Sequence, residues 1–225
     1  MCGIVGYVGG DQAAPILLHG LEKLEYRGYD SAGVAVYDGT SIRVVKTKGR
    51  LKVLEEKTHG GTDLNGFVGI GHTRWATHGK PSDVNAHPHV SSSGKFAVVH
   101  NGIIENYLPL RAALEAKGFR FVSETDTEVV AQLLDDCYKG DLLAAVREAL
   151  AKIRGSYALG ILCSDYPDRV IAVRKDSPLI VGLGKGENFI ASDVPAILDR
   201  TRDIYRLTEN EIAVVKRDGV SVFSP

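Results

Sequence analysis

The second residue of the chain is a cysteine whose position permits nucleophilic catalysis. If Met1 is removed, as is usual before a small residue, Cys2 becomes the N-terminus and its thiol lies beside its own free α-amine. A thiolate is the reactive form of cysteine, and an α-amine with a pKa near ~8 can accept the thiol proton close to neutral pH. Nucleophile and base would then belong to one residue. The alternative is a cysteine that merely starts a strand.

The other two cysteines predict no chemistry of their own. Cys137 lies in a helical pattern and Cys163 in an apolar strand pattern, and free cysteines in such runs are commonly small packed residues. Their wide spacing offers neither a disulfide framework nor a CxxC metal clip.

Several histidines suggest two further chemistries. His87 and His89 flank a proline and suggest a metal site, but without acidic or cysteine partners at ligand spacing we expect no metal. His72, His78 and His100 could serve a Cys-His mechanism, although an N-terminal amine makes a histidine base unnecessary.

A set of ordered motifs carries a family resemblance. The opening CGIVG at residues 2–6 resembles the start of the class II glutamine amidotransferases, which are N-terminal nucleophile hydrolases that release ammonia from glutamine. Further segments resemble the glutaminase domains of the glucosamine-6-phosphate synthase family, the isomerising glutamine:fructose-6-phosphate aminotransferases. These segments are residues 24–33 (LEYRGYDSAG), 71–79 (GHTRWATHG), 85–89 (NAHPH), 100–106 (HNGIIEN) and 123–128 (SETDTE).

The resemblance implies a catalytic set. Cys2 is the expected nucleophile, and Asn101 with Gly102 is expected to hold the oxyanion through a side-chain NH₂ and an unhindered backbone N–H. As a bare dipeptide, Asn-Gly more often forms a turn. The implied reaction is hydrolysis of L-glutamine to glutamate and ammonia, with no cofactor.

Substrate anchors follow from the same resemblance. Arg74 is expected on the glutamine α-carboxylate with Thr77 and His78 nearby, and Asp126 is expected on the α-ammonium. Taken alone, Arg74 would more often be a surface charge and Asp126 a helix N-cap, and Asp126 could serve both purposes.

Two residues have secondary predicted roles. Arg27 resembles the position that organises the N-terminal pocket, and Trp75 resembles the gate beside the substrate, although both could be structural.

Two enzymatic alternatives and one non-enzymatic alternative remain open at this point. The chain could hydrolyse another amide with an N-terminal thiol, could be the glutaminase domain of a different amidotransferase, or could be a glutamine-sensing module with a blocked terminus.

The resemblance implies a fold that fits the order of predicted elements. It is an α+β N-terminal nucleophile hydrolase fold, a four-layer α/β/β/α sandwich with two antiparallel sheets, and strands and helices occur in blocks without regular βαβ alternation. Residues 4–8 predict a strand, and Asp11 a helix cap for a helix running to about Tyr26. The remaining predictions are a hairpin at 34–37 and 42–46, a helix at 51–57, a strand at 67–72, a long connection at 77–95, a strand at 96–100, helices at 106–117, 127–138 and 142–153, and strands at 157–163, 169–174, 179–183, 189–191, 205–207, 211–216 and 220–223.

Composition narrows the class of protein. The 225 residues are 44% hydrophobic and 24% charged, which is typical of a folded globular chain. A net charge of -1 without a dense basic stretch argues against nucleic acid as a partner, and no apolar run reaches the ~20 residues of a membrane helix. We therefore expect a cytoplasmic protein.

The expected domain organisation is simple. Residues 1–225 are predicted to form one type 2 glutamine amidotransferase domain without the sugar isomerase domains. Fructose 6-phosphate would then meet the protein only through those domains, in a full-length enzyme expected to be a homo-oligomer.

Overall fold

Two antiparallel sheets packed face to face form the centre of the molecule. The computed structural model describes residues 1–224. The first sheet has seven strands in the spatial order β11-β9-β10-β1-β4-β2-β3. Its strands are β1 (Gly3–Val8), β2 (Ser31–Tyr37), β3 (Ile42–Lys48), β4 (Val68–Arg74), β9 (Ile180–Leu183), β10 (Asn188–Ala191) and β11 (Asp203–Arg206).

The second sheet has six strands in the order β13-β12-β8-β7-β6-β5. Its strands are β5 (His89–Val90), β6 (Phe96–Ile104), β7 (Gly155–Cys163), β8 (Arg169–Lys175), β12 (Ile212–Lys216) and β13 (Gly219–Phe223). The predicted connection over residues 77–95 is therefore wrong in part, since β5 lies within it. His89 pairs with Val98 and Val90 with Ala97, which adds a short edge strand to β6.

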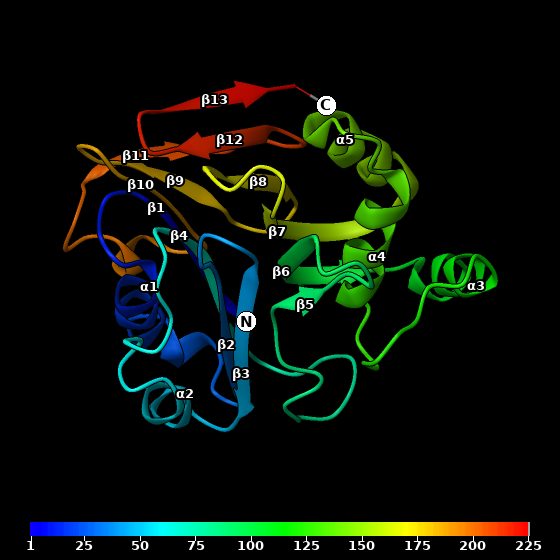
Figure 1. The fold of residues 1–225 in the computed structure, drawn as a ribbon, viewed down its shortest axis with the longest axis horizontal. Helices are drawn as coiled ribbons and strands as arrows, with labels where there is room; N and C mark the ends of the chain where they lie inside the picture. Colours follow the sequence, from blue (N-terminus) through cyan, green and yellow to red (C-terminus); the bar gives the residue numbers. More distant parts are fainter. Residues whose placement is uncertain (225) are drawn as a thin grey trace.

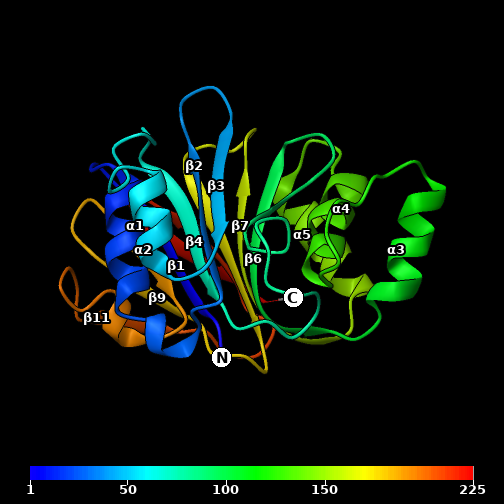
Figure 2. The same cartoon turned by 90° about the horizontal axis from the view of Figure 1, so that it is seen from below.

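Helices cover both outer faces of this sandwich (Figures 1 and 2). On the first sheet lie α1 (Ala13–Glu22) and α2 (Leu51–Lys57), and on the second lie α4 (Thr127–Cys137) and α5 (Leu142–Lys152). The helix α3 (Tyr107–Ala116) packs outside α4 and buries only Leu114 fully. The predicted four-layer α/β/β/α sandwich is confirmed, and within residues 1–224 no helix is long and apolar enough to cross a bilayer.

Three apolar layers follow from this stacking. One lies between α1 and the first sheet, one between the sheets, and one between the second sheet and α4 and α5. All six residues of β1 are buried because both faces of that strand are covered, whereas the edge strand β13 has no buried residue. The cysteines Cys137 and Cys163 lie in the outer layer against the helices, as predicted.

The first helix differs from its prediction at both ends. The chain adopts α1 only over Ala13–Glu22, and Asp11 does not cap it. The Asp11 carboxylate instead lies 2.6 Å from the Arg200 guanidinium, and this ion pair competes with the capping role. The segment expected to continue the helix to Tyr26 forms a separate 3₁₀ turn, η1 (Glu25–Arg27), which turns Arg27 toward the interior.

Candidate active site

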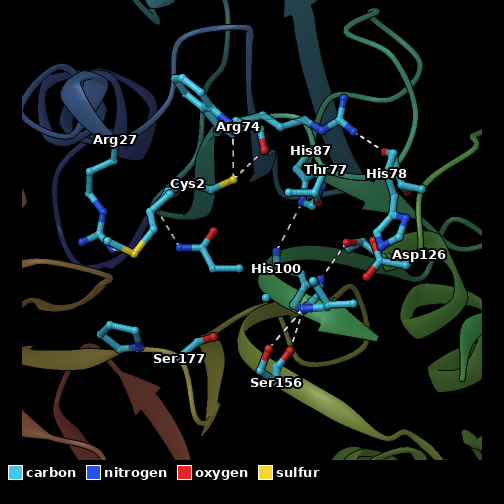
Figure 3. Close-up of a pocket in the computed structure, with 18 residues that line it drawn as sticks. Cys2, Arg27, Arg74, Thr77, His78, His87, His100, Asp126, Ser156 and Ser177 are labelled. Atoms are coloured by element: carbon cyan, nitrogen blue, oxygen red, sulfur yellow. Dashed lines mark hydrogen bonds between the residues drawn. The ribbon is translucent and has the colours of Figure 1, made fainter. Parts of the chain in front are cut away.

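A single cavity of about 310 Å³ collects all the predicted site residues. It lies where the first strand begins, beside the ends of β4 and β6, so both sheets contribute to its walls. Figure 3 shows the labelled side chains arranged around it. The predicted residues that line the cavity are Cys2, Arg27, Arg74, Trp75, Thr77, His78, Asn101, Gly102 and Asp126.

The Cys2 thiol is held against the backbone that follows β4. The Trp75 N–H donates to the Cys2 Sγ at 3.1 Å, and the thiol donates to the Trp75 carbonyl at 3.5 Å. Burial raises the pKa of the Cys2 thiol. The hydrogen bond from the Trp75 N–H and the positive charge of the Met1 terminal ammonium act in the opposite direction. The thiol is therefore protonated near neutral pH and needs a base to become a nucleophile.

The residues on either side of Cys2 shape this position. In the unprocessed chain Met1 precedes Cys2, so the Cys2 nitrogen is a peptide nitrogen. The Met1 sulfur lies 3.7 Å from the Arg27 Nη2. A Cβ on Gly3 would lie 2.7 Å from the Thr73 Oγ1 and 2.8 Å from the Leu24 Cβ. Glycine at position 3 therefore permits the chain next to Cys2 to pack closely against Thr73 and Leu24.

Asn101 and Gly102 lie inside β6 and do not form a turn. The Asn101 Nδ2 donates to the Cys2 carbonyl at 3.0 Å, which places an amide donor next to the predicted nucleophile. Gly102 has a φ of +122°, and a Cβ there would lie 2.2 Å from the Ser156 carbonyl oxygen. Only glycine fits this position, because both its dihedral angle and its neighbour exclude a side chain.

Arg74 ends β4 as a buried cation. Its Nη2 donates to the carbonyls of His78 and Gly79, and its Nη1 lies 3.5 Å from the carbonyl of Lys80. No carboxylate of residues 1–224 lies within 4.0 Å of the guanidinium, and burial lowers its pKa. The buried charge therefore favours an anionic ligand. Bidentate binding of a carboxylate would require one Nη2–H to break its hydrogen bond to the loop carbonyls of His78 or Gly79.

Asp126 directly precedes α4 and lines the cavity. Its Oδ2 accepts from the Ile104 N–H at 2.8 Å, and its side chain makes no cap hydrogen bond to the helix. The alternative that Asp126 could also cap the helix is not met, because its side chain bonds to the end of β6 and makes no hydrogen bond to α4. The carboxylate is buried and has no ion-pair partner in the described chain, which leaves it able to hold a cation.

The remaining predicted residues lie at the rim and at one end of the cavity. Trp75 is half exposed, and its ring meets the Tyr29 ring edge-on at 5.5 Å. Arg27 is buried and donates to the Ser192 carbonyl at 3.2 Å while pairing with Asp193 at 3.4 Å. Arg27 thus joins the start of the chain to the turn after β10.

His78 and Thr77 belong to the loop that closes over Arg74. The His78 ring lies 5.5 Å from the Tyr107 ring, which connects this loop to α3. Thr77 is exposed at the cavity mouth. Asp30 holds the same loop, since its carboxylate accepts from the Ala76 N–H. The neighbouring Ser31 hydroxyl in β2 donates to the same carboxylate. Sequence reasoning missed Asp30, whose only signal is its place within the YRGYDSAG segment.

The buried histidines form a neutral group. Burial lowers the pKa of His72 to about 3 and also lowers the pKa values of His87, His89 and His100. His87 and His100 line the cavity, but neither makes a hydrogen bond to the Cys2 thiol. Among residues 1–224, no group of three histidine, cysteine or carboxylate side chains is placed to hold a metal ion.

Comparison with known proteins shows the family of the chain. A family model described as a glutamine amidotransferase domain matches residues 72–199. The chain is 62% identical to the glutamine–fructose-6-phosphate aminotransferase (isomerizing) of Clostridium tetani over 99% of its own length and 36% of the relative's. It is 61% identical to the protein of the same name from Caldanaerobacter subterraneus subsp. tengcongensis, over 98% of this chain and 36% of that one.

A solved structure shows the same fold. The glutamine phosphoribosylpyrophosphate amidotransferase of B. subtilis, complexed with ADP and GMP, superposes with a TM-score of 0.86 at 25% identity. The match covers 99% of this chain and 49% of that chain. It confirms the predicted N-terminal nucleophile hydrolase fold, and the chain spans about a third of the length of its curated relatives.

Proposed function

Because the chain belongs to the glutamine amidotransferase domain family, we propose that it hydrolyses the side-chain amide of L-glutamine to glutamate and ammonia. The observation that carries this proposal is the placement of Cys2 in one cavity with a buried cation, Arg74, and a buried carboxylate, Asp126. A free amino acid presents the two opposite charges that such a pair would bind.

The proposed chemical step begins once Met1 is removed. The freed α-amine takes the thiol proton, and the Cys2 sulfur forms a bond to the glutamine side-chain carbonyl carbon. The carbonyl π electrons move to oxygen, and the Asn101 Nδ2–H and the Gly102 N–H stabilise that oxyanion. When the tetrahedral intermediate collapses, its C–N bond breaks. The Cys2 α-ammonium returns the proton to the departing nitrogen, and ammonia leaves.

The acyl-enzyme is then hydrolysed. Water loses a proton to the α-amine and its oxygen bonds to the thioester carbon, and the C–S bond then breaks. The Cys2 α-ammonium returns the proton to the sulfur, which restores the thiol, and the released carboxylic acid ionises to glutamate. The cycle balances without a cofactor.

Substrate binding divides between the cavity walls. Arg74 would hold the α-carboxylate, with Thr77 and His78 beside it, and Asp126 would hold the α-ammonium. Trp75 at the rim would limit access to the cavity, and Arg27 would hold the N-terminal segment.

The names of the curated relatives, which specify an isomerising aminotransferase, support a wider role. The chain would form one domain over residues 1–225 and supply ammonia, within a longer cytoplasmic homo-oligomer, to a sugar isomerase part that makes glucosamine 6-phosphate from fructose 6-phosphate.

The test is ammonia and glutamate release by the chain with Met1 removed, verified by intact mass. We expect turnover of glutamine and little of asparagine or an N-acylated glutamine. Cys2→Ala should abolish turnover, whereas Cys137→Ala, which changes a buried cysteine that does not line the cavity, should preserve it.

A second arm tests the base. A short extension before Cys2 should remove most activity, because an acylated nitrogen is no longer a base. Full turnover by Cys2→Ala, or by the extended chain, would refute the mechanism. Turnover confined to another amide would show that the substrate is misassigned.

A further inference from the structure

His72 occupies the interface between the two sheets, directly behind Asn101. It lies in β4 of the first sheet and is fully buried. Its Nε2 lies 3.0 Å from the Asn101 Oδ1 and 3.1 Å from the His100 carbonyl oxygen, both in β6 of the second sheet. The imidazole therefore links the two sheets at the residue that carries the proposed oxyanion donor.

The identity of these partners determines where the imidazole proton lies. A carbonyl oxygen and a carboxamide oxygen can only accept, so the Nε2 of His72 must carry the hydrogen and share it between them. The Nδ1 has no hydrogen-bond partner within residues 1–224, as expected for the unprotonated nitrogen. Burial lowers the pKa of His72 to about 3, so this single-proton form persists across the neutral range.

This tautomer in turn fixes the orientation of the Asn101 carboxamide. With Oδ1 accepting from His72, the Nδ2 donates toward Cys2, where its distance to the carbonyl oxygen is 3.0 Å. The flipped amide would set Nδ2–H against the His72 Nε2–H and Oδ1 against the Cys2 carbonyl. Both contacts would be repulsive, so only one orientation is satisfied.

A second histidine restrains the backbone of the same strand. The His87 ring stacks on His72 with centroids 4.1 Å apart and an interplanar angle of 10°. Its Nδ1 accepts from the His100 N–H at 3.3 Å. One stacked ring thus holds the amide nitrogen of His100 and the other holds its carbonyl oxygen, which fixes the peptide leading into Asn101.

We propose that His72 is a positioning residue that orients the Asn101 carboxamide, through its Nε2–H, so that the amide donor faces the developing oxyanion. This role rests on the proposed glutaminase function. His72 does not line the cavity and does not transfer protons; it acts only through Asn101.

The test is a double-mutant cycle. His72→Leu removes the donor at similar volume, whereas His72→Gln places an amide NH₂ near the position of Nε2. We expect His72→Leu to lower kcat for ammonia release about tenfold, less than the ~10²- to 10³-fold loss expected for Asn101→Ala. KM should change less than twofold, and His72→Gln should recover most of kcat.

The decisive arm is the Asn101→Ala background. If His72 acts through Asn101, adding His72→Leu to Asn101→Ala should cause no further loss of kcat. An equal fold loss in both backgrounds, or equal kcat for the Leu and Gln variants, would overturn the proposal. Thermal unfolding of each variant identifies losses that come from the fold alone.

A measurement on the unsubstituted protein separates this inference from the proposed function. The ¹⁵N chemical shifts of the His72 ring report which nitrogen carries the proton, whether or not the chain turns over glutamine. We expect the Nε2–H form between pH 5 and 8, and an Nδ1–H form would overturn the positioning role. Absence of glutaminase activity in the processed wild-type chain would instead refute the proposed function.

Discussion

Gly28 provides a sharp test of how the thiol is positioned. It follows η1 and packs against the peptide that joins Arg74 to Trp75, whose N–H donates to the Cys2 sulfur. A Cβ on Gly28 would lie 2.7 Å from the Arg74 carbonyl carbon and 2.9 Å from the Trp75 nitrogen. Its φ of -175° suits any residue, so Gly28→Ala perturbs the site through steric contact alone.

The size of the effect follows from these distances. Carbon atoms in ordinary contact are about 3.5 Å apart, so the peptide would have to move by about 0.8 Å from its present 2.7 Å separation. Overpacking of this kind lowers the free energy of unfolding by about 1–3 kcal/mol. For a chain of this size each kcal/mol corresponds to ~2–4 °C of Tm, so we expect Tm to fall by about 2–12 °C. A misplacement approaching 1 Å at a reacting group can reduce the rate about 100-fold, so we expect kcat to fall about 10- to 100-fold.

The assay compares Gly28→Ala with Gly219→Ala. A Cβ on Gly219, which begins β13, meets nothing within 4 Å and lies outside the cavity. Ammonia release at saturating glutamine and the thermal midpoint are measured for both variants after Met1 removal. Wild-type kcat and Tm in Gly28→Ala would refute the idea that this close approach positions the thiol.

Further expectations concern the substrate anchors, pH and the sugar. Asn101→Ala should lower kcat about 10²- to 10³-fold with little change in KM, because its bond strengthens as negative charge develops; a change confined to KM would contradict this. Arg74→Ala should raise the KM for glutamine about tenfold or more, since a carboxylate anchor acts equally in ground and transition states; an unchanged KM would exclude that role. Because the folded-state pKa of His72 is about 3 and its unfolded value is near ~6.5, the folded state binds fewer protons between these limits. His72 alone should therefore lower the free energy of unfolding by up to ~1.4 kcal/mol for each pH unit below ~6.5. His87, His89 and His100, whose pKa values burial also lowers, should steepen the fall. Urea denaturation from pH 7 to pH 4 measures that slope, which a flat profile would contradict. Fructose 6-phosphate should give no binding heat with this chain, and specific micromolar binding would show that the sugar site is misplaced.

The long periodic elements were predictable from the sequence. The helices expected at 127–138 and 142–153 appear as Thr127–Cys137 and Leu142–Lys152, because apolar residues recur along each at helical spacing and pack on the second sheet. The strands of the last third also appear near their expected bounds, since β-branched runs there are separated by glycine, aspartate and proline.

The site residues were predictable as motifs but not as contacts. An aspartate before a helix is ordinarily its N-cap, yet Asp126 bonds to the Ile104 N–H, a partner that only the packing of β6 against α4 supplies. Arg74 likewise binds carbonyls of the loop that follows it, and no periodicity predicts that fold-back. The His72–Asn101 bond joins two sheets and has no signal in either strand.

The candidate site is divided between the two sheets, so the packing of the sheets determines its geometry. Cys2 precedes a strand of the first sheet and Asn101 belongs to the second, so their separation depends on how closely the sheets approach. Gly160 in β7 lets the sheets approach closely, since a Cβ there would lie 3.0 Å from the Ile190 Cδ1 of the opposite sheet. Protein interiors are too densely packed to absorb such an atom without displacement. The His72 hydrogen bonds cross this same interface, so the apolar layer sets the spacing of the sheets while the imidazole sets the orientation of the amide between them.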